Sequence, residues 1–577
     1  MAVAPGRDDL NRWRQELRRN WFDSTPNLHR VLAVHAGQVR ADEMLPRLRA
    51  FGKVMVDVVE PAVAEMERHS ALPAAVPYDG VGNLVEAVTF HPDHRAAGRA
   101  IWSSGMAAAA AGERGLFEQA ALFYLLSHAG EGGHACPLVC TVGLARALVH
   151  CGSDDQRRQY LGLLTGTDYD RSWRGSQFLT EVQGGSDVGS NTTRAVPDPD
   201  RPGAWRISGE KWFCSVADAD LFAVTARPAG AAPGTRGLGC FAVPRTVDGQ
   251  PNGFRIRRLK DKLGTRSLAS AEIDFDGALG WPIGPVGDGF HVVVEELLNT
   301  SRWMNALGST GIMRRAVLEA TAFARHRRAF GTPIASLPIV REQLAVVKAE
   351  ERAALSSTML LTGLVERIDG GQASDAQRSV HRLLVNANKY VTSVAASDVV
   401  HRAIEILGGN GTIEDFSPLP RLYRDAIVYE SWEGTHNVLC AQAQRDCARL
   451  GLLGPVCDQI RSQLTAAGEA AGADGATVAH ALARVEARMA RGLAQGSTPS
   501  GVGAAAADFR RNLGTLARTL QGASLLAEAS LTPGEAGDEQ RAVAGLFVRR
   551  HLVPGHDPQD DAQWPALVEQ ALAGDAG

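Results

Sequence analysis

The spacing of apolar residues changes along the chain and predicts where helices give way to strands. In the first part, Leu48, Phe51 and Met55 recur near the 3.6-residue helical period, and an Ala- and Leu-rich run follows. Short runs of period two then appear, such as LFAVTA at 221–226 and GCFAVP at 239–244, separated by turn residues. Afterwards the helical period returns. The pattern predicts a mainly α protein with an inserted β domain, with boundaries at 1–174 (helical), 175–290 (β), 291–445 (helical) and 446–577 (C-terminal helical extension).

Two apolar stripes at helical spacing support the C-terminal extension. They comprise Val478, Leu482, Val485, Met489 and Leu493, and then Phe509, Leu513, Leu516 and Leu520. The segment AQGSTPSGVG at 494–503 separates the stripes and is typical of a linker. At least two helices are therefore expected to pack together there.

Composition and charge narrow the class of protein. The 577 residues are 45% hydrophobic and 21% charged, with a net charge of −4, so no global charge attracts nucleic acid or an anionic membrane. No apolar run is long enough to span a bilayer, and the N-terminus lacks the apolar segment of a secretory signal. The eight cysteines form no CxxC pair, which favours reduced thiols in a cytoplasmic protein over disulfides or a metal site.

The stretch 403–439 carries a carboxylate at a candidate site. An apolar helix around Ile404 and Leu407 is expected to stop at the glycines of GGNG, beginning with Gly408. Further on, Glu433 stands directly before a Gly-Thr pair in the sequence WEGT. Glycines allow backbone to approach a planar or phosphorylated ligand, but the same residues also suit a plain helix end followed by a loop.

A second candidate is the loop FLTEVQGGSDVGSNTTR at 178–194. Its hydroxyl groups and backbone N–H groups suit a cofactor cradle, and its turn residues equally suit a surface hairpin. It contains neither a GxGxxG nor a GxxxxGK[ST] motif, so it supports neither a Rossmann nor a P-loop site.

In their order and spacing, GGNG, PRLYRDA and WEGTHN resemble the C-terminal signature of the acyl-CoA dehydrogenase family. The loop at 178–194, the strand EKWFCS and the element HRRAFG resemble further family motifs, and the match runs from about residue 80 to 445. Within the family it is most similar to the AidB-like branch, which also has a C-terminal extension. The resemblance implies a helical domain, a small β-barrel and a helical bundle, with FAD as cofactor and Glu433 as catalytic base.

The resemblance also implies roles for individual residues. Cofactor contacts are expected from Thr180, Gly185, Ser186, Phe213, Ser215, Arg327, Phe330, Gly409, Thr435 and Asn437, and substrate contacts from Arg302, Trp432 and Gly434. Some members take their base from the residue before the pocket arginine. Here that residue is Ser301, which cannot accept an α-proton unaided, so Glu433 is the remaining candidate for the catalytic base. Val182, Gln183, Phe213, Val216 and Glu405 depart from the common pattern.

The expected reaction is α,β-dehydrogenation of an acyl thioester, with an electron-transfer flavoprotein as a typical acceptor. Because the Arg327 element reaches a neighbour's cofactor in the family, a homotetramer is expected. A carrier-protein thioester or another non-CoA substrate is one alternative. A DNA-associated protective flavoprotein is another, but residues 441–577 hold 12 Arg, no Lys and 15 acidic residues, a net charge of −3 that disfavours duplex binding.

Overall fold

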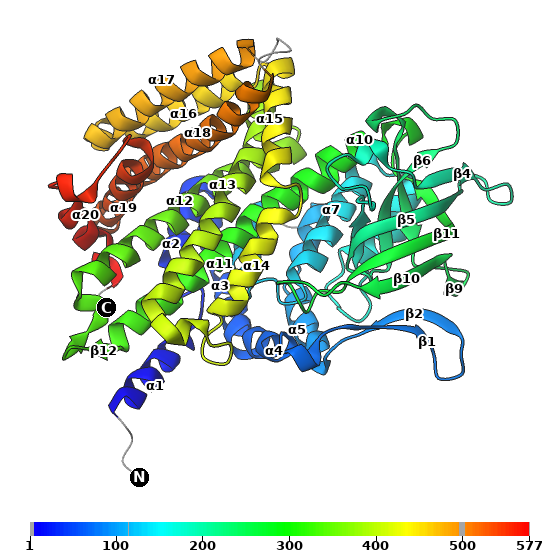
Figure 1. The fold of residues 1–577 in the computed structure, drawn as a ribbon, viewed down its shortest axis with the longest axis horizontal. Helices are drawn as coiled ribbons and strands as arrows, with labels where there is room; N and C mark the ends of the chain where they lie inside the picture. The colour runs from blue at the N-terminus through cyan, green and yellow to red at the C-terminus, as the bar shows by residue number, and fades with distance from the viewer. Residues whose placement is uncertain (1–4, 113–114, 496–501, 576–577) are drawn as a thin grey trace. The chain divides into compact units, whose positions relative to one another are not determined.

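The computed structural model describes residues 5–112, 115–495 and 502–575, which divide into two compact units (Figure 1). The middle unit is Asp57–Met304. The bundle unit combines Met1–Val56 with Asn305–Gly577. The mainly helical fold with an inserted β domain is confirmed.

The middle unit begins with helices and one β-hairpin. Its longer helices are α4 (Glu60–Met66), α5 (Pro92–Trp102), α6 (Leu116–Leu126) and α7 (Ala135–Cys151). The hairpin pairs β1 (Ala74–Tyr78) with β2 (Leu84–Thr89), antiparallel, inside a segment expected to be helical. Pro77 and the turn sequence DGVGN exclude a continuous helix there, so the purely helical expectation for this stretch was wrong.

The β domain is a closed ring of strands with additional strands at its edges. Its strands are β3 (Gly175–Phe178), β4 (Arg194–Pro197), β5 (Trp205–Ser215), β6 (Leu221–Pro228), β7 (Gly239–Pro244), β10 (Phe254–Leu259) and β11 (Ser270–Pro282), with the small pair β8 (Thr246–Val247) and β9 (Gln250–Pro251) beside them. Pairing runs β11–β5–β4–β6–β7 and returns to β11, which closes the ring. Phe178, Phe222 and Phe275 pack in its core. The period-two segments are therefore strands, as predicted.

Long helices form the bundle unit. They are α1 (Pro5–Leu17), α2 (Pro26–Ala36), α3 (Gln38–Val54), α11 (Asn299–His326), α12 (Pro338–Asp369), α13 (Asp375–Leu407), α14 (Leu419–Ser431) and α15 (His436–Leu450). A short hairpin, β12 (Arg328–Ala329) with β13 (Thr332–Pro333), follows α11. Helix α13 ends at Leu407, and the GGNG glycines form the turn Gly408–Thr412, as expected.

The C-terminal extension continues the bundle with α16 (Leu453–Ala467), α17 (Gly472–Gln495), α18 (Val502–Ser530), α19 (Gly534–Leu552) and α20 (Trp564–Ala571), coloured orange to red in Figure 1. Both predicted stripes face the packed side: Val478, Leu513 and their stripe partners are buried, apart from the half-buried Leu493. Each buried large side chain contributes about 1.5–3 kcal/mol relative to exposure. Helix α18 packs on α16, α17 and α19 and also on α12 and α13. Most of the expected linker lies outside the described residues.

Among the helices that the structure describes, none is both long and apolar enough to cross a membrane.

Candidate active site

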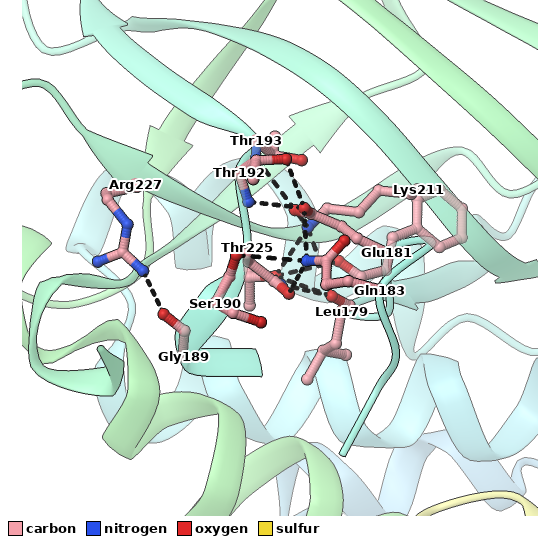
Figure 2. Close-up of polar contacts among 12 residues, drawn as sticks. Leu179, Glu181, Gln183, Gly189, Ser190, Thr192, Thr193, Lys211, Thr225 and Arg227 are labelled. Carbon is pink, nitrogen blue, oxygen red and sulfur yellow. Dashed lines mark hydrogen bonds and ion pairs between the residues drawn. The ribbon is translucent and has the colours of Figure 1, made fainter. Parts of the chain in front are cut away.

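A buried ion pair anchors the loop at 178–194 (Figure 2). Glu181 lies near the start of the loop, and its carboxylate accepts hydrogen bonds from the backbone N–H groups of Thr192 (2.6 Å) and Thr193 (3.1 Å) near the end of the loop. Lys211, fully buried in β5, places Nζ 2.9 Å from Glu181 Oε1 and 3.1 Å from Thr225 Oγ1. Both ends of the loop are thus tied to the barrel.

The Glu181 carboxyl is held in its ionised form. Burial would raise its pKa, but the Lys211 charge and the hydrogen bonds from Thr192, Thr193 and Lys211 outweigh burial and lower the pKa to about 2. Sequence reasoning overlooked Glu181 and Lys211, because a lysine in a strand pattern ordinarily faces solvent. The one available signal was the position of each residue beside an expected cofactor contact: Glu181 directly follows Thr180, and Lys211 directly precedes the aromatic pair of EKWF.

The outer part of this loop presents the expected cofactor contacts. Thr180 is half-buried and its carbonyl accepts from the Trp212 N–H at 2.9 Å, which joins the loop to β5. A Cβ on Gly185 would lie 2.4 Å from Thr180 Oγ1, so only glycine allows this close approach. Ser186 is exposed next to it. The structure therefore brings Thr180 and Gly185 into contact and leaves the Ser186 hydroxyl accessible.

A bulge in β5 sets the direction of the aromatic residues. Opposite β11, Cys214 pairs with Ala271 and Lys211 with Ile273, so β5 holds one extra residue between these pairs. Lys211 and Cys214 consequently both face inward at 0% exposure, and Phe213 is left 54% exposed. Lys260 Nζ lies 3.6 Å from the centre of the neighbouring Trp212 ring.

Beyond the bulge, Ser215 is half-buried at the end of β5 and its Oγ lies 3.1 Å from Ser270 Oγ. Val216 follows with φ 58°, an uncommon conformation for a β-branched residue. Phe213 and Ser215 thus place an aromatic ring and a hydroxyl group two residues apart at the accessible end of β5. The first residues of α11 belong to the middle unit, and there Arg302 and Ser301 are buried, with Ser301 Oγ accepting a hydrogen bond from Gln177 Nε2 at 2.9 Å.

In the bundle unit, the corner Trp432–Gly434 joins α14 to α15 with a strained backbone. Glu433 has φ 59° and Gly434 has φ 99°, both in the left-handed region. This region costs a non-glycine residue about 1–3 kcal/mol and persists only where the surroundings impose it. The sequence indicated the turn through Gly434 but gave no sign that the glutamate itself takes this conformation.

Buried contacts impose that conformation. Lys389 of α13 is fully buried, and its Nζ donates to the carbonyls of Glu430 (3.0 Å) and Gly434 (3.1 Å), on either side of Glu433. The Trp432 ring packs on Tyr429 with centroids 4.6 Å apart, and Asn305 Nδ2 donates to the Tyr429 carbonyl at 3.1 Å. Sequence reasoning overlooked Lys389 as well.

Thr435 and Asn437 lie at the start of α15. Thr435 is the N-cap residue, and its exposed hydroxyl makes no capping bond to the helix, so it can donate to a ligand. Asn437 Oδ1 accepts from Arg510 Nη1 of α18 at 2.7 Å. Nearby, burial opposes ionisation of Glu430, but hydrogen bonds from His436 and Ser397 outweigh it and lower the pKa of Glu430.

The remaining expected contacts lie on exposed turns of the bundle unit. Phe330, at the tip of the β12–β13 hairpin, is 93% exposed with φ 52°, and Arg327 is half-buried at the end of α11. A Cβ on Gly409 would meet no atom within 4 Å, so the backbone there is open to a ligand, whereas Gly411 packs against Ile404. Glu405, which departs from the family pattern, is exposed.

The chemical groups of the expected contact residues are of the kinds that bind a flavin dinucleotide. Hydroxyls, an exposed aromatic ring, an arginine and glycine backbone without side-chain cover are the groups that a planar ring system and a diphosphate require. Within the described ranges no group of three or more His, Cys, Asp or Glu side chains is arranged to hold a metal ion, and the eight cysteines are free thiols.

The chain is similar to known proteins along most of its length. Residues 11–171 match the adaptive response protein AidB N-terminal domain, 176–278 the acyl-CoA dehydrogenase middle domain, and 287–447 the acyl-CoA dehydrogenase C-terminal domain. The putative acyl-CoA dehydrogenase AidB of Escherichia coli is 35% identical over 386 residues, which cover 65% of this chain and 69% of that protein.

Solved structures resemble it as well. Caenorhabditis elegans ACDH-11 in complex with C11-CoA superposes with a TM-score of 0.85 at 26% identity, covering 96% of this chain and 94% of that one. An acyl-CoA dehydrogenase from Bacillus anthracis, complexed with FAD, has the same fold with a TM-score of 0.72 at 20% identity, covering 93% and 89%.

Proposed function

This chain belongs to the acyl-CoA dehydrogenase family, and we propose that it is an FAD-dependent oxidoreductase that dehydrogenates an acyl thioester between Cα and Cβ, with Glu433 as the base. One observation carries the proposal: Glu433 occupies a strained left-handed conformation at a corner that buried Lys389 holds on both sides. Strain retained at a carboxylate is typical of a site selected for function.

The protein's own part in this reaction is to position the substrate and to remove a proton. The Glu433 carboxylate takes the α-proton, and the electron pair left on Cα forms the new double bond as Cβ loses a hydride. Because the α-proton is weakly acidic, the thioester oxygen needs a hydrogen-bond donor, and the backbone N–H of Glu433 is suited to this role. Trp432, Gly434 and Arg302 are the proposed substrate contacts. When bound, FAD supplies the hydride acceptor.

The cofactor would be held by two groups of residues. Thr180, Gly185, Ser186 and Ser215 would contact the flavin through hydroxyl and backbone groups, with Phe213 flanking the ring. Thr435, Asn437 and Gly409 would contribute from the bundle unit. Two solved structures of the same fold support the proposed kinds of ligand, since one is complexed with FAD and the other with C11-CoA.

Phe330 at the tip of the exposed hairpin and the half-buried Arg327 directly before it suit contact with the FAD diphosphate of a neighbouring copy. The proposed assembly is accordingly a homotetramer, with an electron-transfer flavoprotein as acceptor. Light scattering tests the assembly: a monomer that retains FAD tightly would contradict it.

The function is tested by recording the flavin spectrum of the purified protein without oxygen while acyl-CoAs of graded length and branching are added. We expect a yellow protein whose flavin absorbance bleaches with one group of acyl-CoAs. If only an acyl carrier protein thioester bleaches the flavin, the proposed dehydrogenation stands, but the acyl group is delivered by a carrier protein and not by CoA. A protein that stays colourless after incubation with FAD would overturn the proposal.

A further inference from the structure

A cavity of about 270 Å³ lies among four helices of the bundle unit: α12, α13, α18 and α19. The first two helices belong to the bundle and the last two to the C-terminal extension. Its lining combines the apolar side chains of Ala354, Val391 and Val394 with several charged side chains. None of the lining residues belongs to the candidate active site.

The two carboxylates in the cavity wall are already paired with cations. Glu350 accepts from His551 Nε2 at 2.6 Å and lies 3.1 Å from Arg550 Nε. Burial would raise the pKa of Glu350, but the charge and hydrogen bond of His551, together with the charges of Arg550 and Arg518, outweigh burial and lower the pKa to about 2. Asp398 Oδ2 accepts from Arg402 Nε at 2.8 Å. Neither carboxylate therefore needs a cation from a ligand.

Arg518 differs from these groups. It projects from α18 into the cavity, and across residues 5–112, 115–495 and 502–575 its guanidinium has no hydrogen-bond or ion-pair partner. Among the lining residues, the charges of Arg518 and Arg550 balance those of Glu350 and Asp398, but the Arg518 guanidinium is left without a hydrogen-bonded carboxylate. A half-buried guanidinium is ordinarily paired, since an unpaired charge in a low-dielectric site is costly.

We propose that this cavity binds a small carboxylic acid anion. The ligand's carboxylate pairs with the planar fork of Arg518, and its short alkyl chain packs on Ala354, Val391 and Val394. A phosphate is disfavoured, because its second charge would face Glu350 and Asp398. The ligand contacts α12 and α13 as well as α18 and α19. It therefore binds only when the C-terminal extension is packed on the bundle, and its binding stabilises that packing by mass action.

The test uses full-length protein loaded with FAD, at constant ionic strength. Butyrate, neutral butyramide and inorganic phosphate are titrated by calorimetry, and the melting temperature is measured with each. We expect saturable butyrate binding with a Kd of about 1 mM, as suits a ligand of this size. Butyrate should raise the melting temperature, whereas butyramide should not. Phosphate should bind at least about tenfold more weakly.

Two variants assign the binding to this cavity. Arg518→Gln should weaken butyrate binding by at least about tenfold, and Ala395→Leu should abolish it by filling the cavity without changing a charge. Arg511→Gln, on the same helix but exposed and paired with Asp508, is the matched control and should bind like the wild type. Absence of saturable binding, equal binding of butyramide or phosphate, or normal binding to Arg518→Gln would each overturn the proposal. Flavin content, recorded in parallel, reports separately on the proposed function.

Discussion

Two fully buried lysines support the two groups of candidate residues in different ways. Lys211 in β5 pairs with the Glu181 carboxylate and secures a loop, whereas Lys389 in α13 donates to two backbone carbonyls beside Glu433. The first arrangement neutralises a buried charge, and the second holds a strained backbone. The contrast suggests that the loop depends on charge balance for its stability and the corner depends on hydrogen-bond geometry for its chemistry.

The largest effect is expected from Glu433→Gln, which removes the proposed base and leaves the corner's supports in place. Substrate-driven flavin reduction should slow by about 10²–10⁴-fold, and exchange of the substrate α-proton should slow with it. FAD should remain bound. Glu469→Gln, on the exposed surface of the extension, is the control. Unchanged reduction in a folded, yellow Glu433→Gln protein would exclude this residue as the base.

Lys211→Met tests the charge-balanced loop. It leaves Glu181 buried without its cation, so the free energy of unfolding should fall by about 3–5 kcal/mol, with weaker FAD retention. The double variant Glu181→Gln, Lys211→Met should recover much of the loss, because both charges are then absent. Arg201→Gln, in an exposed pair with Asp248 of the same domain, should leave the denaturation midpoint unchanged. A similar loss in the single and double variants would refute the charge-balance explanation.

Lowering the pH tests the charge balance of the loop without a change at Lys211. The pKa of Glu181 is about 2 in the folded protein against an ordinary value of 4.5, so its contribution is present above pH 4.5 and is lost as the pH falls towards 2. The loss amounts to about 3 kcal/mol. Glu350 titrates in the same window. Denaturant midpoints measured from pH 7 to pH 3 should fall less steeply for Glu181→Gln than for the wild type, and parallel curves would contradict this assignment.

The smallest effect is expected from Lys389→Met. The carbonyls of Glu430 and Gly434 lose a donor, which should cost about 2 kcal/mol of stability. Flavin reduction should slow by about tenfold as Glu433 loses its fixed conformation, while FAD binding to the loop is retained. Stopped-flow reduction separates this result from Glu433→Gln, since a carboxylate is still present. Loss of FAD with a normal rate per bound flavin would reverse the roles assigned to the two lysines.

Patterns local in sequence were predictable here. Alternation in LFAVTA and GCFAVP indicated strands, and the glycines after Leu407 indicated the end of α13. The resemblance supplied candidate residues, whose cofactor and substrate roles remain predictions. The functions of Lys211 and Lys389 were not predictable, because burial of a charge depends on partners distant in sequence. The hairpin β1–β2 was overlooked since its strands are short and Pro77 interrupts one of them.

The extra residue in β5 has a consequence for how this protein could diversify. Because Lys211 and Cys214 both point inward across the bulge, positions 212 and 213 are released from the packing of the barrel. Substitutions there change the surface offered to a ligand at little cost to folding. Deletion of either position would remove the bulge and restore strict alternation, which keeps Lys211 and Cys214 on the inward face and leaves a single outward residue between them. The bulge therefore supplies one additional outward position, so that two neighbouring residues of this strand, and not one, can be adapted to a ligand.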